Sequence, residues 1–331
     1  MNIPPDTSIV YASCTRPGYD VLETLFDKGV EISEIVSITP EMAERHTVAK
    51  YRSFDRIAAK HDVPIYYPDT YSMTAVDTDH FATLDADLMI VNGWQRLIPG
   101  EVLDTFTHGV LGNHGSAYGL PKGRGRSPLN WSLIEDLDRF LLSIIRLDPG
   151  VDSGAVAATR KFDITEFDTI ETLYHKVTVS IQSMLLEIIE PICNGSHTFE
   201  QQIGEPTYYP KRNPEDGEIT WTDPTRRIYN LVRAVTDPYP GAFTHHEGTR
   251  IDIWELIPFS SDIAFSTPPG EIVEAFSTGD FVVSTPDGTA LVTEWDADNW
   301  TPERGMQLRV DGEPTRVDSP DQKHHLTSSD S

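Results

Sequence analysis

The sequence has 331 residues, more than a single hydrophobic core usually supports, so its length predicts two domains. Acidic residues outnumber basic ones by 52 to 26, which gives a formal net charge of −26 at pH 7. The acidic excess is spread over the whole chain, and we interpret it as halophilic, an adaptation to concentrated salt. No apolar run approaches the ~20 residues that cross a bilayer, and the first residues show no secretory pattern, so we expect a soluble, cytoplasmic protein.

The first part of the chain alternates short apolar runs with amphipathic stretches. Apolar runs predict strands at residues 8–12, 30–38, 63–67, 86–92 and 140–146. Apolar residues at helical spacing predict helices at residues 19–28, 51–61, 99–106, 129–136 and 169–189. This alternation predicts a Rossmann-like α/β domain over residues 1–203, with a parallel sheet covered by helices on both faces.

The composition changes at residues 204–214, where Pro, Tyr and polar residues predict a linker. A predicted helix at 224–235 is followed by short alternating runs at residues 243–245, 250–256, 271–276, 280–285 and 290–295. Strands this short, separated by Gly, Pro and Asp, predict a small, OB-like C-terminal β-barrel over residues 215–306. Residues 307–331 are predicted to form a partly disordered tail.

The two cysteines, Cys14 and Cys193, are far apart in sequence and have no second Cys or His at ligand spacing. A disulfide framework or a zinc site is therefore not expected. We interpret both residues as small buried hydrophobes.

Two loops that follow predicted strands carry residues able to transfer protons. His114 ends an apolar strand and precedes a Gly- and Pro-rich loop, whereas Asp152 lies between Gly150 and Gly154 after the strand 140–146. Ligands of open parallel sheets bind at the carboxyl ends of the strands, so we expect this imidazole and this carboxylate to meet there. A single histidine at a strand end is also compatible with a purely structural role. The prediction therefore rests on the histidine and the aspartate together.

At these motifs the sequence resembles the folate-dependent formyltransferases, over nearly its whole length. The first-domain motifs are Gly93-Trp-Gln-Arg-Leu-Ile-Pro99, His114-Gly-Ser116 with Leu120-Pro-Lys-Gly-Arg-Gly125, and Val151-Asp-Ser-Gly154. Trp221, Asn230-Leu-Val-Arg-Ala-Val235 and Asp237-Pro-Tyr-Pro-Gly-Ala-Phe243 resemble the carboxyl-terminal domain shared by methionyl-tRNA formyltransferases and amino-sugar formyltransferases. The resemblance implies formyl transfer from 10-formyltetrahydrofolate to an amine, without a metal ion.

His114 and Asp152 match the catalytic histidine and aspartate of that family. The family also has an asparagine two residues before the histidine, which donates a hydrogen bond to the formyl oxygen. Here that position is Gly112, and an asparagine follows it as Asn113. Adjacent strand residues face opposite sides, so Asn113 replaces the donor only if the backbone bulges. We expect such a replacement rather than a loss of activity, and we include Asn113 in the predicted catalytic group.

The resemblance further implies that the folate pocket is formed by Trp94, Arg96, Leu97, Ile98 and Val151, through main-chain groups and apolar contacts. Leu97 and Ile98 are also compatible with a place in the core. A second group predicts a site for an anionic acceptor and contains Ser116, Lys122, Arg124 and Arg126. The alternative for the basic residues is a solvated loop.

Three functions remain open at this point. The acceptor is an amino sugar carried by a nucleotide, or it is methionyl-tRNA, or the chain is a catalytically silent protein that binds folate or a nucleotide. Binding of tRNA depends on an extended positive surface, which this acidic chain does not predict. Gly112 is the feature that favours the silent alternative.

Overall fold

The computed structural model describes residues 2–263 and 265–309, which cluster into two compact units. The first unit takes in the described residues up to Gly125 together with 140–162 and 174–208. The second takes in 126–139, 163–173 and the described residues from Tyr209 onward. Two short segments of the predicted first domain therefore cluster with the C-terminal part of the chain.

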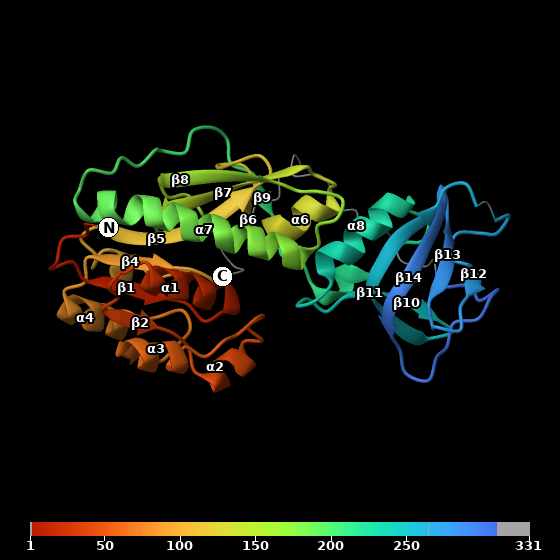
Figure 1. The fold of residues 1–331 in the computed structure, drawn as a ribbon, viewed down its shortest axis with the longest axis horizontal. Helices are drawn as coiled ribbons and strands as arrows, with labels where there is room; N and C mark the ends of the chain where they lie inside the picture. The colour runs from red at the N-terminus through yellow and green to blue at the C-terminus, as the bar shows by residue number, and fades with distance from the viewer. Residues whose placement is uncertain (1, 264, 310–331) are drawn as a thin grey trace. The chain divides into compact units, whose positions relative to one another are not determined.

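The first unit contains a seven-stranded sheet and its covering helices (Figure 1). The strands are β1 Ile9–Ala12, β2 Glu34–Val36, β3 Ile65–Tyr66, β4 Leu88–Val91, β5 Gly109–Ser116, β7 Arg139–Arg146 and β8 Val156–Asp163. The helices are α1 Arg16–Asp27, α2 Pro40–Arg45, α3 Asp55–His61, α4 Ala75–Leu84, α5 Gly100–Leu103 and α7 Ile170–Cys193. A short pair is formed by β6 Arg124–Gly125 and β9 Tyr208–Tyr209.

The strand order is β3-β2-β1-β4-β5-β7-β8, with parallel pairing from β3 to β5 and antiparallel pairing of β5 with β7. All four residues of β1 are buried, as expected for a strand that is covered by helices on both faces. From β1 the chain adds β2 and β3 on one side and β4 and β5 on the other, so the topological switch point of the sheet lies at the carboxyl ends of β1 and β4. The predicted Rossmann-like sheet is confirmed.

Helices α1 and α7 lie side by side over one face of this sheet (Figure 1). The side-chain amide of Gln182 in α7 donates to the carbonyl oxygen of Asp20 and to the hydroxyl of Thr24, both in α1. Helices α4 and α5 cover the opposite face, where their apolar side chains share a core cluster with the strands. Members of this cluster include Val10, Ala12, Phe81, Met89, Val102 and Val110.

Alternation along β5 decides which side chains reach each face. Val110 belongs to the cluster beneath α4 and α5. Residues two apart share a face, so Gly112 and His114 also face that side. Leu111 and Asn113 face α7.

The second unit is built on a five-stranded antiparallel sheet of order β10-β11-β14-β13-β12. Its elements are α6 Pro128–Ile134, α8 Thr225–Val235, β10 Ala242–His246, β11 Thr249–Ser260, β12 Ile272–Ala275, β13 Phe281–Thr285 and β14 Gly288–Asp296. Met306 accepts a hydrogen bond from Ile272 of β12, and the N–H of Arg309 donates to His245 of β10. The segment 306–309 therefore joins the two edge strands, and the predicted small β-domain is confirmed as an antiparallel sheet closed in this way.

The two segments that come from the middle of the chain are bonded firmly into this second unit. Asn130 of α6 donates from its side-chain amide to the carbonyl oxygen of Ala234, at 2.7 Å. The guanidinium of Arg233, only 4% exposed, donates to the carbonyl oxygens of Thr165 and Asp168, at 2.8 and 2.9 Å. These contacts make 126–139 and 163–173 structural parts of the C-terminal unit.

The sequence pattern does not predict α2, α4 or β8. Strand β8 lies at the sheet edge, and most of its side chains are half-buried or exposed, so it lacks an apolar run. The expected linker at 204–214 contains β9, and the expected tail contains the bonded segment up to Arg309, while residues 310–331 lie outside the described part of the chain. Within residues 2–263 and 265–309, no helix is long and apolar enough to span a membrane.

Candidate active site

His114 lies near the end of β5, at the carboxyl end of the parallel sheet. The pairing of β4 with β5 stops at Leu111, so the following residues of β5 have no strand on that side. The side chain of His114 is 9% exposed. It therefore lies at the edge of the sheet, formed by the carboxyl ends of the strands, where open parallel sheets bind their ligands.

Both ring nitrogens of His114 face oxygen atoms. Nε2 is 2.9 Å from the carbonyl oxygen of Gly123, and Nδ1 is 3.4 Å from Oδ2 of Asp152. A carbonyl oxygen only accepts hydrogen bonds, so Nε2 carries a hydrogen in this arrangement. The distance to Asp152 exceeds that of a well-formed hydrogen bond, so the imidazole and the carboxylate are close neighbours.

Asp152 occupies the loop between β7 and β8 with its backbone in the left-handed region, at φ 51°. Its Oδ2 also accepts a hydrogen bond from the N–H of Gly125, at 2.9 Å. The side chain is 23% exposed, so solvent and small molecules reach it. The loops predicted from sequence thus bring an imidazole and a carboxylate together.

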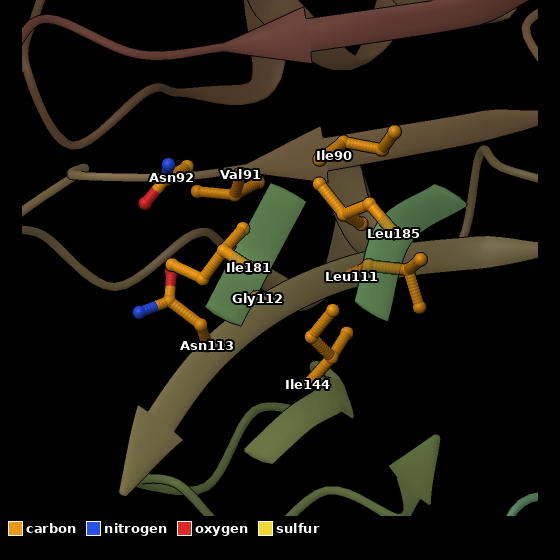
Figure 2. Close-up of a pocket in the computed structure, with 9 residues that line it drawn as sticks. All are labelled: Ile90, Val91, Asn92, Leu111, Gly112, Asn113, Ile144, Ile181 and Leu185. Atoms are coloured by element: carbon orange, nitrogen blue, oxygen red, sulfur yellow. The ribbon is translucent and has the colours of Figure 1, made fainter. Parts of the chain in front are cut away.

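Asn113 does not join them. The register of β5 against β7 is regular from Leu111 to Ser116, so the bulge that would turn Asn113 toward His114 is absent from this strand. Figure 2 shows the Asn113 side chain directed toward Ile181 of α7, in a small pocket between the sheet and that helix. The prediction that Asn113 belongs to the catalytic group is therefore corrected: it lies on the other face of the sheet.

Leu147 fills the space on the His114 side of Gly112. A Cβ built on Gly112 would lie 2.6 Å from Cδ2 of Leu147, which is closer than real Cβ contacts come. Leu147 is half-buried and packs against the core cluster beneath α4 and α5. Gly112 and Leu147 therefore complement each other in size, at the position where the formyltransferases that the sequence resembles have their asparagine.

Two of the residues predicted to bind an anionic acceptor serve the protein itself. Ser116 is fully buried, and its hydroxyl donates to the carbonyl oxygen of Lys122 at 2.6 Å. Arg124 is 9% exposed, and its guanidinium donates to Gln202 and Tyr208. Both groups hold the loop through these bonds, and their predicted role in binding an acceptor stays a prediction.

The other two basic residues of that prediction are exposed. Lys122 belongs to the first unit, on the loop between His114 and the short strand β6. Arg126 belongs to the second unit. The two exposed residues thus fall in different units, and their role in binding an anionic acceptor stays a prediction.

Four of the five predicted folate residues follow β4, where the chain leaves the sheet, and Val151 lies in the loop between β7 and β8. The indole of Trp94 packs against the ring of Tyr71, and its buried N–H has no partner among the described residues. The guanidinium of Arg96 lies over the same tyrosine ring, 5.0 Å from its centre. Tyr71 was not predicted from sequence, because it lies in a loop without a repeating pattern.

The apolar residues of the folate prediction separate into two kinds. Leu97 is 56% exposed and Val151 is 38% exposed, so both are accessible to a ligand. Ile98 is 6% exposed and belongs to the core cluster beneath α4 and α5. Ile98 is thus a core residue, the alternative that its apolar character allowed.

Cys14 is a buried residue two positions after the end of β1. Its thiol contacts the hydroxyl of Tyr71 at 3.3 Å and the carbonyl oxygen of Gly93 at 3.5 Å. Burial raises the pKa of the thiol to about 11, which makes it a poor nucleophile. Over the described residues, no three or more His, Cys, Asp or Glu side chains are grouped to hold a metal ion.

Solved structures with this fold share low sequence identity with the chain. HypX from Aquifex aeolicus, in complex with tetrahydrofolic acid, is 20% identical over 87% of this chain with a TM-score of 0.63. The chain spans only 44% of HypX, less than half of its length. The N-formyltransferase from Helicobacter canadensis, with folinic acid and dTDP-3-aminofucose, is 15% identical over 88% of this chain and 100% of that one, with a TM-score of 0.65.

A third similar structure is the methionyl-tRNA formyltransferase from Clostridium thermocellum. It is 19% identical over 76% of this chain and 93% of that one, with a TM-score of 0.54. At these identities the likeness establishes the fold.

Family models cover both units. The model described as formyl transferase matches residues 20–189, and the model described as formyl transferase, C-terminal domain, matches residues 211–304. The first match includes both side chains of the pair formed by His114 and Asp152. The chain belongs to the formyl transferase family.

Proposed function

We propose that this formyl transferase moves a formyl group from 10-formyltetrahydrofolate to the primary amine of an amino sugar carried by a nucleotide. His114 and Asp152, here called the catalytic pair, would carry out the chemistry. The observation that carries this proposal is the 3.4 Å approach of the two side chains at the carboxyl end of the sheet. Leu97 and Val151 are exposed apolar residues that would contact the folate.

The reaction sets two tasks for these residues. The amine nitrogen bonds to the formyl carbon, the bond from that carbon to N10 of the folate breaks, and the products are an N-formyl amine and tetrahydrofolate. Negative charge grows on the formyl oxygen, to which Nδ1 of His114 donates in the imidazolium form, with a hydrogen on both ring nitrogens. A proton leaves the amine nitrogen for Asp152, directly or through water, and Asp152 passes this proton on to N10 as the bond from N10 to the formyl carbon breaks.

His114 carries more of the oxyanion stabilisation here than in an enzyme with an asparagine beside it. Gly112 has no donor, Leu147 fills its place, and Asn113 faces α7. The Nε2–H bond to Gly123 and the Asp152 carboxylate beside Nδ1 fix the orientation of the ring.

Two observations favour a nucleotide-linked amino sugar as the acceptor. The Helicobacter canadensis enzyme, which was solved with dTDP-3-aminofucose, is matched over its entire length. The net charge of −26 disfavours tRNA, because contacts to phosphates dominate the affinity of proteins for nucleic acids. We also propose that the evenly spread acidic charge adapts the enzyme to a salt-rich cytoplasm.

Methionyl-tRNA is the second candidate acceptor, and the likeness to the Clostridium thermocellum enzyme favours it. An assay with 10-formyltetrahydrofolate, a dTDP-linked 3-amino sugar and charged initiator tRNA separates the two. We expect formylation of the sugar at a kcat/KM at least about a hundredfold above that for tRNA. The reverse preference would reject the sugar as substrate.

Variants of the pair test the catalytic assignment. His114→Ala and Asp152→Asn are expected to lower kcat by about a hundredfold or more, since each removes a group that acts in the transition state. Asn113→Ala is the neighbouring control and is expected to keep kcat within about threefold, because its side chain lies on the opposite face. Background activity in all forms, wild type included, would support the silent binding protein instead.

A further inference from the structure

One side chain joins the two loops that hold the catalytic pair. The carboxamide of Gln202 donates from Nε2 to the carbonyl oxygens of Asp152 and Gly154, both at 2.8 Å. Its Oε1 accepts two hydrogen bonds from the guanidinium of Arg124, at 2.7 and 3.2 Å. We propose that Gln202 is a positioning residue, which holds the backbone of Asp152 so that its carboxylate points at His114.

The chemistry of the partners allows only one orientation of this carboxamide. Carbonyl oxygens only accept hydrogen bonds and a guanidinium only donates them. If the amide were turned over, Oε1 would face two carbonyl oxygens and the NH₂ group would face the guanidinium. Gln202 therefore supplies two donors to the Asp152 loop and an acceptor to Arg124, and a residue with donors only or acceptors only cannot replace it.

Asp152 needs such support because of its backbone conformation. Its φ of 51° lies in the left-handed region, which costs free energy for any residue with a Cβ. The direction of the Cα–Cβ bond follows from the backbone, so the carboxylate reaches His114 only while this conformation is kept. The two bonds from Gln202 attach on either side of Ser153 and fix the loop at both points.

Through its bonds to Arg124, Gln202 also holds the loop that contacts both members of the catalytic pair. Arg124 lies between Gly123, whose carbonyl oxygen accepts from His114, and Gly125, whose N–H donates to Asp152. The N–H of Gly123 also donates to the hydroxyl of Thr207, at 2.9 Å. Residues 202–207 thus clamp the loop from outside, although the sequence pattern predicts part of this segment as a plain linker.

This inference rests on the proposed role of Asp152, and its test compares Gln202→Glu with Gln201→Glu. Both changes add the same charge at neighbouring positions, but Gln201 is exposed whereas Gln202 is half-buried. Gln202→Glu keeps an acceptor for Arg124 and turns carboxylate lone pairs toward two carbonyl oxygens. In the assay with a dTDP-linked 3-amino sugar, we expect Gln202→Glu to lower kcat by roughly ten- to a hundredfold. Each KM should stay within about threefold, and Gln201→Glu should behave as wild type.

A double variant separates action through Asp152 from a general structural role. In an Asp152→Asn background, Gln202→Glu is expected to lower kcat by less than about twofold more, because the group that it positions is already gone. An undiminished further loss would overturn the inference. Full activity of Asp152→Asn alone would instead overturn the proposed function, so the two failures are distinguishable.

A readout that needs no acceptor completes the test. The ring resonances of His114, assigned with His114→Ala, are expected to move in Gln202→Glu in the same direction as in Asp152→Asn and to stay in place in Gln201→Glu. Gln202→Asn, which keeps both chemical groups on a shorter arm, is measured in the same way and covers the case in which the charged variant does not fold. If Gln202→Glu or Gln202→Asn folds and leaves both the His114 resonances and kcat unchanged, the positioning role of Gln202 is rejected.

Discussion

Adding a single methyl group at Gly112 brings it into the space of a neighbouring side chain. The new Cβ would lie 2.6 Å from Cδ2, 3.1 Å from Cγ and 3.2 Å from Cδ1 of Leu147. Gly112 lies in a regular strand without a positive φ, so the backbone itself accepts alanine. The effect of Gly112→Ala therefore depends on Leu147.

The magnitude follows from two opposing contributions. Overpacking costs about 1–3 kcal/mol, and replacing a strand glycine by alanine returns about 0.5–1 kcal/mol. With Leu147→Ala already present the overlap is gone, and Gly112→Ala then stabilises the protein by about 0.5–1 kcal/mol. The coupling free energy between the two positions is thus about 1–3 kcal/mol, or roughly 2–12 °C in Tm at the 2–4 °C per kcal/mol typical of domains of 150–250 residues.

The assay is a double-mutant cycle measured by thermal and denaturant unfolding of wild type, both single variants and the double variant. We expect Gly112→Ala to raise Tm in the Leu147→Ala background and to lower it, or leave it unchanged, in the wild type. Additive effects within about 0.5 kcal/mol would show that Leu147 does not occupy the space at Gly112, and the argument about the absent asparagine would then lose its basis.

Three further predictions concern charge and burial. Asp287 accepts hydrogen bonds from the N–H and hydroxyl of Thr225 at the start of α8, which hold the pKa of its carboxyl below the ordinary value. Asp287→Ala should therefore cost about 0.5–2 kcal/mol near neutral pH. In pH-dependent unfolding the difference should begin to shrink as the pH falls below about 4, the ordinary pKa of an aspartate, and should be lost once the pH lies below the lowered pKa of the folded wild type; a difference that persists unchanged at pH 2 would contradict this. Cys14, with its raised pKa and no exposed surface, should react with iodoacetamide at pH 8 far more slowly in the folded than in the denatured protein, and equal rates would refute its burial. The unfolding temperature should rise from 0.1 M to about 2 M KCl, because salt shortens the Debye length from about 10 Å to 3 Å or less and screens the repulsion within a chain of net charge −26; a fall over this range would count against salt adaptation.

The sequence predicted those parts of the fold whose pattern is local. Strands β1, β4 and β7 carry apolar runs, and α7 has apolar residues at helical spacing, so each was expected at nearly its observed place. The edge strand β8 has mostly half-exposed side chains and carries no such signal. The closing segment 306–309 was missed because its partners in β10 and β12 lie far away in sequence.

The same distinction applies to the candidate site. His114 and Asp152 were predictable because each follows a strand of one sheet, and strand order alone brings such loops together. Gln202 was not, because its bonds span 48 to 78 residues and no local pattern marks it. The burial of Arg124 was not predictable, because a charged residue in a glycine-rich loop is normally solvated, whereas here it is bonded to Gln202.

The path of the chain between the two units has a consequence for anyone who wishes to divide or recombine this enzyme. Helix α6 and the stretch 163–173 belong to the C-terminal unit although residues 174–208 of the first unit follow both of them in sequence. No single cut yields two self-sufficient halves, because a fragment ending at residue 208 would keep α6 without Ala234 and the stretch 163–173 without Arg233. If the C-terminal part of the chain is exchanged between relatives, it must therefore fit the host's helix α6 and stretch 163–173. Sequence changes in the catalytic part and in the C-terminal part are coupled for the same reason.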